Sequence, residues 1–448
     1  MYKPTRYYVT EKARDDGLLL MSTLNSTYLK FSSPYTDKVS TLLKTPMIPE
    51  EQVQNDPVLS ILKQYQFIFN TSYDESLAVD VMHKSHVYSD KWLYLTILPT
   101  NNCNFRCVYC YETPEPQYMS DQTEKNILDF CRKNVHRYQF VRLNWFGGEP
   151  LLEKERVLRI SKELDKICRE YGVPLIGLMS TNGYELDVDT FRALISYRIL
   201  SYQICLDGDR CTHNVQRPHY VESDSYERVL NNLIAIQKQV RSRTYKIGIR
   251  ANMTPFVEEH MQEHLERLSQ YFAGDSRFNI YFQGIRDWGG ERIKINQPEI
   301  ISDEEDYYRK WYDVACEMGL SSAETLEFAP VYGLCEANLK NGYVINYDGS
   351  IVKCSLASYN KKYQNINNIG SIQEGGKCTI DEEKSARWIV NRVKNESCYS
   401  CYIYPICCGG SCPYMKNIKG KDTCLPIKEM LKAHLRCLDY KHKIPTVL

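Results

Sequence analysis

TNNCNFRCVYCYE, residues 100–112, carries three cysteines at the spacing C-x3-C-x2-C. It follows an apolar run, WLYLTIL (92–98), that predicts a β-strand. Thiolates this close together are typical ligands of zinc or of an iron–sulfur cluster. Zinc would need a fourth ligand from a distance, because the next cysteine, Cys131, lies on a predicted helix over 121–134. Three thiolates on a 4Fe–4S cluster would instead leave one iron open to a reactant.

The composition predicts a cytoplasmic protein rather than a membrane or nucleic-acid-binding one. Its 448 residues include 56 basic and 56 acidic side chains, so no basic excess indicates nucleic acid. No apolar run approaches the ~20 residues that a membrane helix needs, and the first residues are too polar for a signal peptide. In such a compartment the 18 cysteines indicate metal binding rather than disulfides.

The first part of the chain predicts a small α+β module, with three short strands before two helices. The strands are expected at 6–10, 18–23 and 27–31, and the helices at 33–45 and 56–68. The polar stretch 72–90 is interpreted as a linker.

From Trp92 onward, apolar β-type runs alternate with amphipathic helical segments. The runs lie at 93–98, 141–146, 175–180, 201–207, 246–253 and 278–284, and the helices include 153–171, 226–240 and 261–272. Six such alternations predict an α/β fold with parallel strands, a partial (β/α)6 barrel of the TIM type. Functional residues of such a barrel collect at the carboxyl ends of the strands. After about residue 320 the alternation stops and cysteines dominate.

Several motifs together resemble the radical S-adenosylmethionine (SAM) enzymes, whose signature is C-x3-C-x-aromatic-C. Here the signature reads Cys103, Cys107, Tyr109 and Cys110. WFGGEP (145–150), STNG (180–183) and CLDGDRCTHNVQRP (205–218) follow the next three predicted strands, as the SAM-binding motifs do in that family. By this resemblance the SAM-binding residues are Tyr109, Gly147, Gly148, Glu149, Pro150, Ser180, Asn182 and Arg217.

The resemblance implies a specific chemistry. SAM would chelate the open iron of the cluster held by Cys103, Cys107 and Cys110, and one electron would cleave its sulfonium. The 5′-deoxyadenosyl radical so formed abstracts hydrogen from an unactivated carbon. The cofactors carry this chemistry, while the barrel excludes water and aims the radical.

The carboxyl-terminal cysteines resemble the SPASM extension, which holds two auxiliary 4Fe–4S clusters. The first would take Cys335, Cys354 and Cys412, and the second would take Cys398, Cys401, Cys407 and Cys424. The spacing departs from the family pattern because x4 separates Cys407 from Cys412, so Cys408 is an alternative to Cys407. Cys437 is likewise an alternative to Cys424.

The first auxiliary cluster lacks the extra cysteine that some relatives place just before its first ligand. We therefore hypothesise that it also keeps one iron open, where a substrate thiolate could bind. The alternative is that Cys316, Cys378, Cys408 or water closes it.

The amino-terminal module resembles a RiPP recognition element, the domain that binds the leader of a ribosomally synthesised precursor peptide. An exposed sheet edge can accept a leader as an added strand. The alternative is a module that only packs on the barrel.

These features predict three domains: a recognition element-like domain over 1–85, the radical SAM barrel over 90–320 and a SPASM domain over 321–448. The expected function is modification of a precursor peptide, with a Cys thioether crosslink as first choice and an auxiliary cluster as acceptor of the leftover electron. Carbon–carbon crosslinking and anaerobic sulfatase maturation, which makes formylglycine, are the alternatives.

The expected cofactors are three 4Fe–4S clusters and SAM, with a flavodoxin or ferredoxin as reductant. An iron–sulfur electron carrier and a zinc-based interaction module are the alternatives from other classes. The acidic residues Glu149, Asp207, Asp287 and Glu291 follow predicted strands, but the sequence assigns none of them as a general base.

Overall fold

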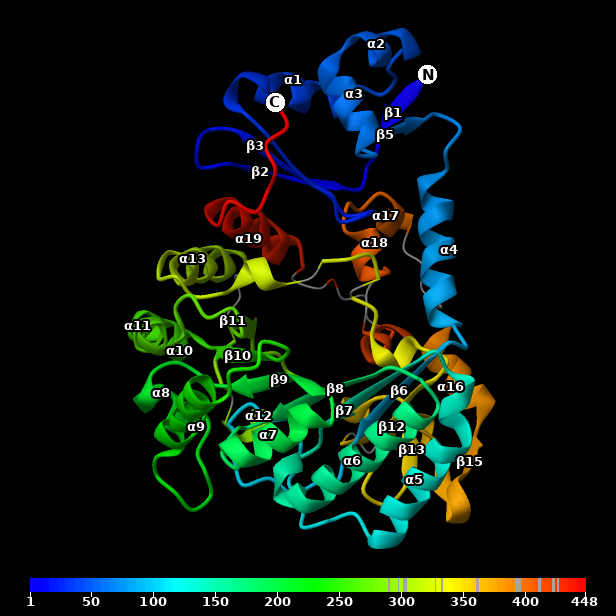
Figure 1. The fold of residues 1–448 in the computed structure, drawn as a ribbon, viewed down its shortest axis with the longest axis vertical. Coiled ribbons are helices and arrows are strands. Elements are labelled where there is room, and N and C mark those ends of the chain that lie inside the picture. The colour runs from blue at the N-terminus through cyan, green and yellow to red at the C-terminus, as the bar shows by residue number, and fades with distance from the viewer. Residues whose placement is uncertain are drawn as a thin grey trace.

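The structure is a computed structural model of residues 1–448. It describes residues 1–448 except 289–290, 297, 301–303, 327, 332, 360–361, 391–395, 410–411, 421–423 and 425–426, and it leaves out the side chains of 291, 304–306 and 324. The amino-terminal module forms one end of the molecule and the large sheet forms the other (Figure 1).

Six parallel strands form the centre of the large sheet, and each one pairs with the next along the chain. They are β6 (Trp92–Ile97), β7 (Phe140–Trp145), β8 (Leu175–Thr181), β9 (Ile199–Cys205), β10 (Lys246–Met253) and β11 (Phe278–Gly284). Because all six run in one direction, their carboxyl ends meet at one edge. The predicted α/β fold with a partial barrel of parallel strands is confirmed.

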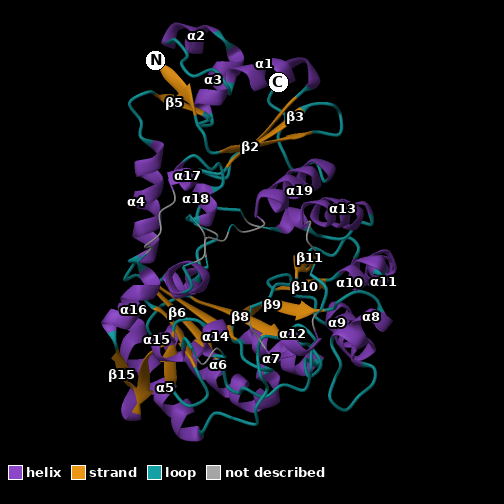
Figure 2. Ribbon diagram, turned by 180° about the vertical axis from the view of Figure 1, so that it is seen from behind, coloured by secondary structure: helices purple, strands orange, loops and turns teal. Residues whose placement is uncertain are grey.

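Amphipathic helices cover this sheet (Figure 2). They include α5 (Asp121–Asn134), α6 (Lys154–Glu170), α7 (Val188–Ser196), α9 (Ser225–Gln239) and α11 (Met261–Phe272). The side chains of Ser120 and Asp187 accept hydrogen bonds from backbone amides in the first turns of α5 and α7. Such caps satisfy amides that have no partner within the helix, which fixes where each helix begins.

The sheet extends beyond the six predicted strands. β12 (Gly342–Ile345) pairs in parallel with β6, and β13 (Ser350–Val352), β14 (Asn368–Gln373) and β15 (Lys377–Ile380) continue the sheet antiparallel. The result is a mixed ten-stranded sheet. The cysteine-rich region is therefore joined to the barrel by backbone hydrogen bonds, which its residue pattern did not predict.

The remaining helices are short or lie in the second half of the chain. They are α8 (Arg210–Gln216), α10 (Pro255–Glu259), α12 (Glu291–Asn296), α13 (Glu304–Glu317), α14 (Ser355–Ser358), α15 (Gln364–Asn367), α16 (Glu382–Ile389), α17 (Glu396–Tyr399), α18 (Tyr404–Cys407) and α19 (Ile427–Tyr440).

The amino-terminal module contains an antiparallel sheet of β2 (Tyr8–Lys12), β3 (Leu18–Ser22) and β4 (Tyr28–Phe31), as predicted. Helices α1 (Thr36–Leu42), α2 (Glu50–Asn55) and α3 (Pro57–Gln64) follow. β1 (Tyr2–Pro4) pairs with β5 (Ile68–Asn70), so the helix expected over 56–68 ends earlier.

The interpretation of residues 72–90 as a linker is wrong, because helix α4 (Glu75–Val87) occupies most of this stretch. It begins after Asp74, whose side chain accepts a hydrogen bond from the Leu77 amide. Its apolar pattern is weak in sequence, and contacts with the cysteine-rich region stabilise it. Tyr404 donates its hydroxyl to Asp80 at 2.7 Å, for example.

The module shares a hydrophobic core with the carboxyl-terminal region. Val9, Leu19 and Met21 pack against Ile406 of α18 and Leu435 of α19. The two regions therefore pack together as one unit and are not separate domains joined by a linker. Among the described helices, none has the length and apolarity needed to span a membrane.

Candidate active site

A cavity of about 260 Å³ lies at the carboxyl edge of the parallel strands. The loop after β6 contributes Cys103, Cys107, Tyr109 and Cys110 to its wall. The ends of β7, β8, β9, β10 and β11 and the segments that follow them contribute the rest, including Gly147, Gly148, Glu149, Ser180, Asn182, Arg217, Arg250 and Asn252. The fold thus brings residues more than 140 positions apart to one place, where a parallel α/β sheet is expected to bind ligands.

The cysteine loop is held against the segment that follows β9. Arg106 donates its amide to the Pro218 carbonyl at 2.8 Å, and Val108 donates its amide to the Gln216 carbonyl at 3.0 Å. Burial raises the pKa of Cys107 to about 11, so a metal must displace its proton to bind. Among the described residues, no three His, Cys, Asp or Glu side chains are arranged to share one metal ion.

Two glycines let the end of β7 approach the cysteine loop. A Cβ on Gly148 would lie 2.0 Å from the Asn102 carbonyl oxygen, and one on Gly147 would lie 2.7 Å from the Thr100 carbonyl oxygen. Gly147 also has a φ of +121°, which other residues rarely adopt. This contact admits only glycine, and it places the β7 backbone in the cavity wall beside the cysteines.

Glu149 joins the ends of β7 and β8. Its buried carboxylate accepts hydrogen bonds from the Thr181 hydroxyl and the Asn182 amide, both at 2.6 Å, and from the Leu151 amide at 3.0 Å. Burial raises the pKa of Glu149 to about 7, although these hydrogen bonds favour its charged form. Pro150, also assigned to SAM, is buried but does not line the cavity.

The two polar residues of STNG differ in their surroundings. Ser180 lines the cavity, and within the described residues its hydroxyl has no hydrogen-bond partner in the protein. The Asn182 side chain donates to Asn104 at 2.6 Å and accepts from the Tyr184 amide at 3.0 Å. Ser180 is therefore available to a ligand, whereas Asn182 mainly fixes the two loops.

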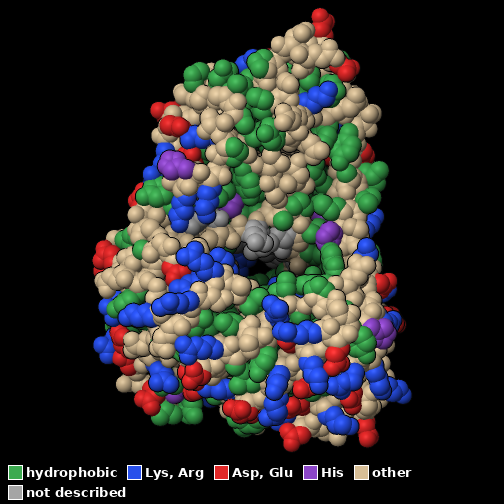
Figure 3. Space-filling view, in the orientation of Figure 1, with side chains coloured by type: hydrophobic (Ala, Val, Ile, Leu, Met, Phe, Trp, Pro, Cys, Tyr) green, Lys and Arg blue, Asp and Glu red, His purple; other side chains and the backbone are tan. Residues whose placement is uncertain are grey.

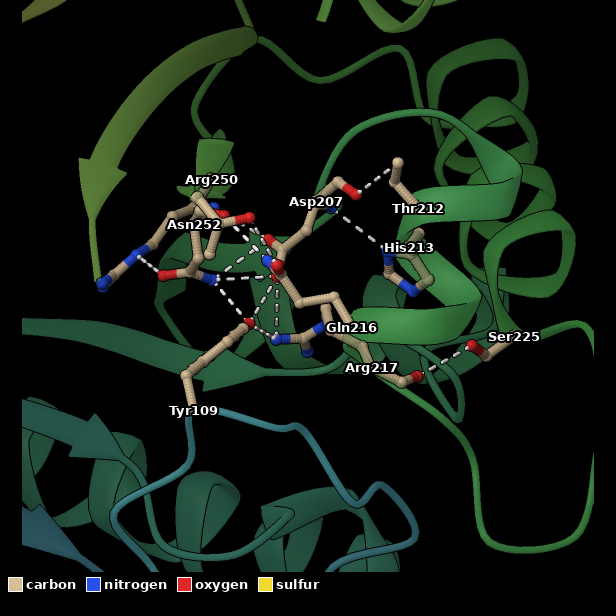
Figure 4. Close-up of polar contacts among 10 residues, drawn as sticks. Tyr109, Asp207, Thr212, His213, Gln216, Arg217, Ser225, Arg250 and Asn252 are labelled. Atoms are coloured by element: carbon tan, nitrogen blue, oxygen red, sulfur yellow. Dashed lines mark hydrogen bonds and ion pairs between the residues drawn. The ribbon is translucent and has the colours of Figure 1, made fainter. Parts of the chain in front are cut away.

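Tyr109 lies at the centre of a buried polar network (Figure 4). Its hydroxyl donates to Asp207 at 2.5 Å and accepts from Arg217 at 2.5 Å and from Asn252 at 2.7 Å. Asp207 is fully buried and also accepts from the Asn252 amide at 2.8 Å and from Gln216 at 3.2 Å. The network ties the aromatic position of the cysteine signature to the ends of β9 and β10.

Arg217 keeps unused hydrogen-bonding capacity at the cavity. Its side chain is 6% exposed, and its Nε has no partner among the described residues. Burial disfavours its charge, but Cys107, Tyr109, Cys205 and Asp207 more than compensate and raise the pKa of Arg217. The buried positive charge of Arg217 lies at the cavity that Cys103, Cys107 and Cys110 also line. It therefore fits a cluster whose open iron also binds an anionic group of a ligand.

Residues 97–268 match the family model of the Radical SAM superfamily. This protein is a radical SAM enzyme. It is 23% identical over 292 residues to the GTP 3′,8-cyclase of Nautilia profundicola, covering 60% of this chain and 83% of that protein.

Two solved structures resemble the radical SAM enzyme in fold. Native anSMEcpe with bound AdoMet and Kp18Cys peptide has a TM-score of 0.52 at 18% identity, covering 78% of this chain and 97% of that one. Streptococcus suis SuiB bound to precursor peptide SuiA has a TM-score of 0.50 at 16% identity, covering 94% of this chain and 98% of that one.

Sequence reasoning did not assign several residues of this cavity. Arg250 and Asn252 interrupt the apolar pattern near the end of β10, and this was the available signal. Cys205, which the sequence pattern assigned no role, also lines the cavity. It stands at the end of β9, where parallel strands present side chains to ligands.

The three cysteines assigned to the first auxiliary cluster pack against the same small core, although no three metal-ligating side chains of the described residues are arranged to share one metal ion. Cys335, Cys354 and Cys412 lie around one small core that includes Trp388 and Tyr414. Cys316 and Cys378 pack in the barrel core instead, and Cys408 lines a separate cavity beside α4, so none of these joins the group of three. Tyr111 lies within electrostatic range of both Cys110 and Cys354, which connects this site to the SAM cavity.

The cysteines assigned to the second auxiliary cluster are less closely grouped. Cys401 and Cys407 lie in the core shared with the amino-terminal module, Cys398 packs beside Tyr7, and Cys424 is exposed. The alternative ligand Cys437 is 1% exposed within the barrel core, with its sulfur 3.7 Å from the Tyr312 carbonyl oxygen.

Proposed function

We propose that this radical SAM enzyme modifies a ribosomally synthesised precursor peptide and that its first product is a Cys thioether crosslink. The observation that carries this proposal is that Cys335, Cys354 and Cys412 pack against one small core, with no further cysteine of the described residues in that core, and that Tyr111 lies between this core and the SAM cavity. A cluster held by three thiolates would keep one position open to the thiolate of a substrate cysteine.

The proposal assigns each group of residues a task. Cys103, Cys107 and Cys110 would hold the first cluster, Ser180 and Arg217 would bind polar groups of SAM, and Gly147 and Gly148 would let the backbone approach it. When bound, the cluster and SAM supply the 5′-deoxyadenosyl radical that removes hydrogen from carbon. Tyr109 and Asp207 would keep the Arg217 guanidinium fixed and charged.

The proposal extends to the rest of the chain. Residues 1–85 would bind the leader, residues 90–320 would form the catalytic barrel, and residues 321–448 would form a SPASM domain with two auxiliary clusters. The cofactors would then be three 4Fe–4S clusters and SAM, with a flavodoxin or ferredoxin as reductant. The match in fold to SuiB over 94% of this chain, module included, supports this division.

Formylglycine formation and carbon–carbon crosslinking remain alternative reactions for the same site. Binding of a Cys-containing peptide does not separate them, since the anSMEcpe structure also holds a peptide. The chemical composition of the products distinguishes these reactions. A thioether removes one hydrogen from carbon and one from the thiol, whereas formylglycine replaces the thiol by an aldehyde.

The test is anaerobic incubation of the reconstituted enzyme with SAM, a reductant and a Cys-containing precursor peptide, followed by mass spectrometry. We expect loss of two hydrogens and no free thiol in the product. Cys354→Ser should abolish the product while 5′-deoxyadenosine still forms, and the exposed Cys211→Ala should match the wild type. A crosslink that leaves the thiol free, or full activity of Cys354→Ser, would overturn the thioether assignment.

A further inference from the structure

We propose that Arg250, Arg286 and Arg292 form one wall of the SAM cavity, called here the arginine wall, and that this wall binds a carboxylate of the peptide substrate. This inference rests on the proposed function and deepens it, because it names the chemical group by which the substrate would be held beside the radical. The wall follows the last two strands of the barrel: Arg250 lies on β10, Arg286 lies two residues after β11, and Arg292 lies on α12.

The charges that line this cavity are separated in space. Its acidic lining residues, Glu112 and Glu149, belong to the cysteine loop and to the end of β7. None of the described lining residues from β10, α12 or the segment after β11 is acidic. Asp207 lies within electrostatic range of Arg250, but its oxygens already accept hydrogen bonds from the network around Tyr109. The side of the cavity with the arginine wall is therefore positively charged.

Arg250 keeps most of its hydrogen-bonding capacity for a ligand. Its Nε donates to the Asn252 side chain at 2.8 Å, and within the described residues its side chain makes no other hydrogen bond or ion pair. The guanidinium extends away from the polar network around Asp207 (Figure 4). Because a guanidinium is always charged in proteins and presents its donors as a planar fork, a carboxylate matches it in both charge and shape.

Arg292 places the arginine wall next to the cysteine loop. Its Nη1 donates to the Arg106 carbonyl at 3.2 Å, and Asn296 of the same helix donates its side chain to the Val108 carbonyl at 3.2 Å. Helix α12 therefore packs on the loop that carries Cys107. A carboxylate bound by Arg292 would lie beside the thiols proposed to hold the first cluster.

Arg286 extends the wall toward the group around Cys335. It lines the SAM cavity and lies within electrostatic range of Cys412. A substrate residue bound to the wall would thus lie close both to the SAM cavity and to the thiols proposed to hold the first auxiliary cluster. This position suits a peptide that presents one carbon to the radical and a cysteine to the auxiliary site.

SAM alone does not account for three further guanidinium groups. It carries one carboxylate, for which Arg217 is already available in the cavity. A ribosomal peptide carries its common anions at neutral pH on Asp and Glu side chains and at its carboxyl terminus. Since a guanidinium removed from water is costly unless an anion compensates its charge, the wall favours an acidic group next to the carbon that loses hydrogen.

Basic side chains also lie at the surface of the molecule. Several Lys and Arg side chains lie along the rim of the hollow between the amino-terminal module and the large sheet (Figure 3). They would attract an acidic peptide from solution, but salt screens exposed charges and they do not select one carboxylate. We therefore assign the selection to the arginine wall, whose three side chains are half-buried.

The test measures binding of four unlabelled peptides to the reconstituted, SAM-bound enzyme by anaerobic calorimetric titration, without a reductant, so that no radical forms. The peptides are N-acetylated Gly-Cys-Gly-Asp-Gly and Gly-Cys-Gly-Asn-Gly, each with a free or an amidated carboxyl terminus. Comparing Asp with Asn identifies a side-chain carboxylate, and comparing free with amidated peptides identifies a terminal one.

The variants separate the charge of the wall from its shape. Arg250→Gln and Arg292→Gln remove a charge and keep a polar side chain, Arg292→Lys keeps the charge, and Arg192→Gln, at a 49% exposed side chain of α7 outside the cavity, is the matched control. We expect a carboxylate to raise affinity for the wild type by about tenfold or more. Both Gln variants should lose this preference without weaker binding of the amidated Asn peptide. Arg292→Lys should keep part of the preference, and Arg192→Gln should keep all of it.

Three results would overturn the proposal. One is equal affinity of the wild type for all four peptides, or an unchanged preference in both Gln variants. Another is weaker binding of SAM to these variants with the peptide preference intact, because the arginines would then serve the carboxylate of SAM. The third is stronger competition by ATP than by the Asp peptide, because the wall would then select a nucleoside phosphate.

A separate readout distinguishes this inference from the proposed function. If the wild type prefers acidic peptides and the Gln variants do not, but no thioether forms on a precursor while SAM is cleaved, the proposed function fails and the carboxylate site stands. If both Gln variants form the thioether at the wild-type rate and bind all four peptides as the wild type does, the carboxylate site is wrong and the proposed function stands.

Discussion

Asp207 determines the geometry of the site at the scale of single residues. It is fully buried and accepts hydrogen bonds from Tyr109, Gln216 and Asn252, while the Arg217 guanidinium lies 4.0 Å away. A buried carboxylate is tolerated only when its lone pairs are satisfied and its charge is compensated. Asp207 meets both conditions, so its task is to position Tyr109 and Arg217 rather than to transfer a proton.

Asp207→Asn should therefore lower both stability and SAM affinity. The amide would turn a donor toward Asn252 and leave the Arg217 charge without its carboxylate, so we expect a loss of about 2 kcal/mol in unfolding free energy. SAM binding should weaken by about tenfold. Urea unfolding and calorimetric titration measure the two effects. Asp189→Asn, at a 92% exposed side chain, is the control, and an Asp207→Asn variant that behaves like it would refute this role.

At the scale of elements, the contact between the end of β7 and the cysteine loop decides where the thiols lie. Gly148 donates its amide to the Thr100 carbonyl at 3.2 Å, and Glu149 donates its amide to the Asn102 carbonyl at 2.8 Å. These bonds need the close approach that glycine permits. The strand end thus supports the loop that carries Cys103.

Gly148→Ala should displace the cysteine loop, since its Cβ would overlap the Asn102 carbonyl oxygen. A misplacement of about 1 Å can cost about a hundredfold in rate, and we expect that order of loss in 5′-deoxyadenosine formation. Gly172→Ala is the matched control: its Cβ would meet nothing within 4 Å, although its φ of +65° adds strain. Equal rates in the two variants would show that the contact does not matter.

Helix α11 contains a buried histidine that makes stability depend on pH. Burial lowers the pKa of His264 to about 4 from its usual 6.5, and neither ring nitrogen has a partner among the described residues. Between these two values the unfolded chain binds the proton more readily, so stability falls as the pH falls from 6.5 to 4.

His264→Leu should remove this part of the acid sensitivity. We expect the variant to lose about 3 kcal/mol less unfolding free energy than the wild type between pH 7 and pH 4. Urea unfolding at several pH values measures the difference, and comparing the two proteins cancels the shared effect of the carboxylates. Parallel pH profiles would contradict the assignment.

At the scale of the whole molecule, the three parts of the chain cannot be separated cleanly. The amino-terminal module buries Val9 and Met21 against α18 and α19, and β12 continues the barrel sheet. Deleting the module would expose this core, so loss of activity in a truncated chain would not by itself show a role in peptide binding. Point changes at exposed positions of the module, which leave this core intact, are the sharper test.

The proposed cofactor content has a measurable consequence for the intact protein. Three cubic clusters correspond to about twelve iron atoms per chain. Cys354→Ala should reduce this to about eight while 5′-deoxyadenosine still forms, and Cys378→Ala, in the barrel core, should keep about twelve. Iron and sulfide analysis after anaerobic reconstitution measures both. About eight in the wild type, or about twelve in Cys354→Ala, would contradict the assignment.

Local features of the chain could be predicted well from the sequence. The six barrel strands, helix 121–134 and the cysteine spacing depend on residues that are close along the chain, where apolar period and capping act directly. Helix α4 and the pairing of β12 with β6 could not be predicted, because contacts with distant parts of the chain stabilise them.

The sequence by itself therefore determined the parallel α/β barrel and the motifs at its strand ends. Only the tertiary structure decided which side chains meet there. Tyr109 reaches Asp207 from 98 residues away, Cys205 enters the cavity, and Cys316 and Cys378 are excluded from the group around Cys335. The physical reason is that hydrogen bonds and packing between distant residues depend on the path of the whole backbone, which local patterns do not encode.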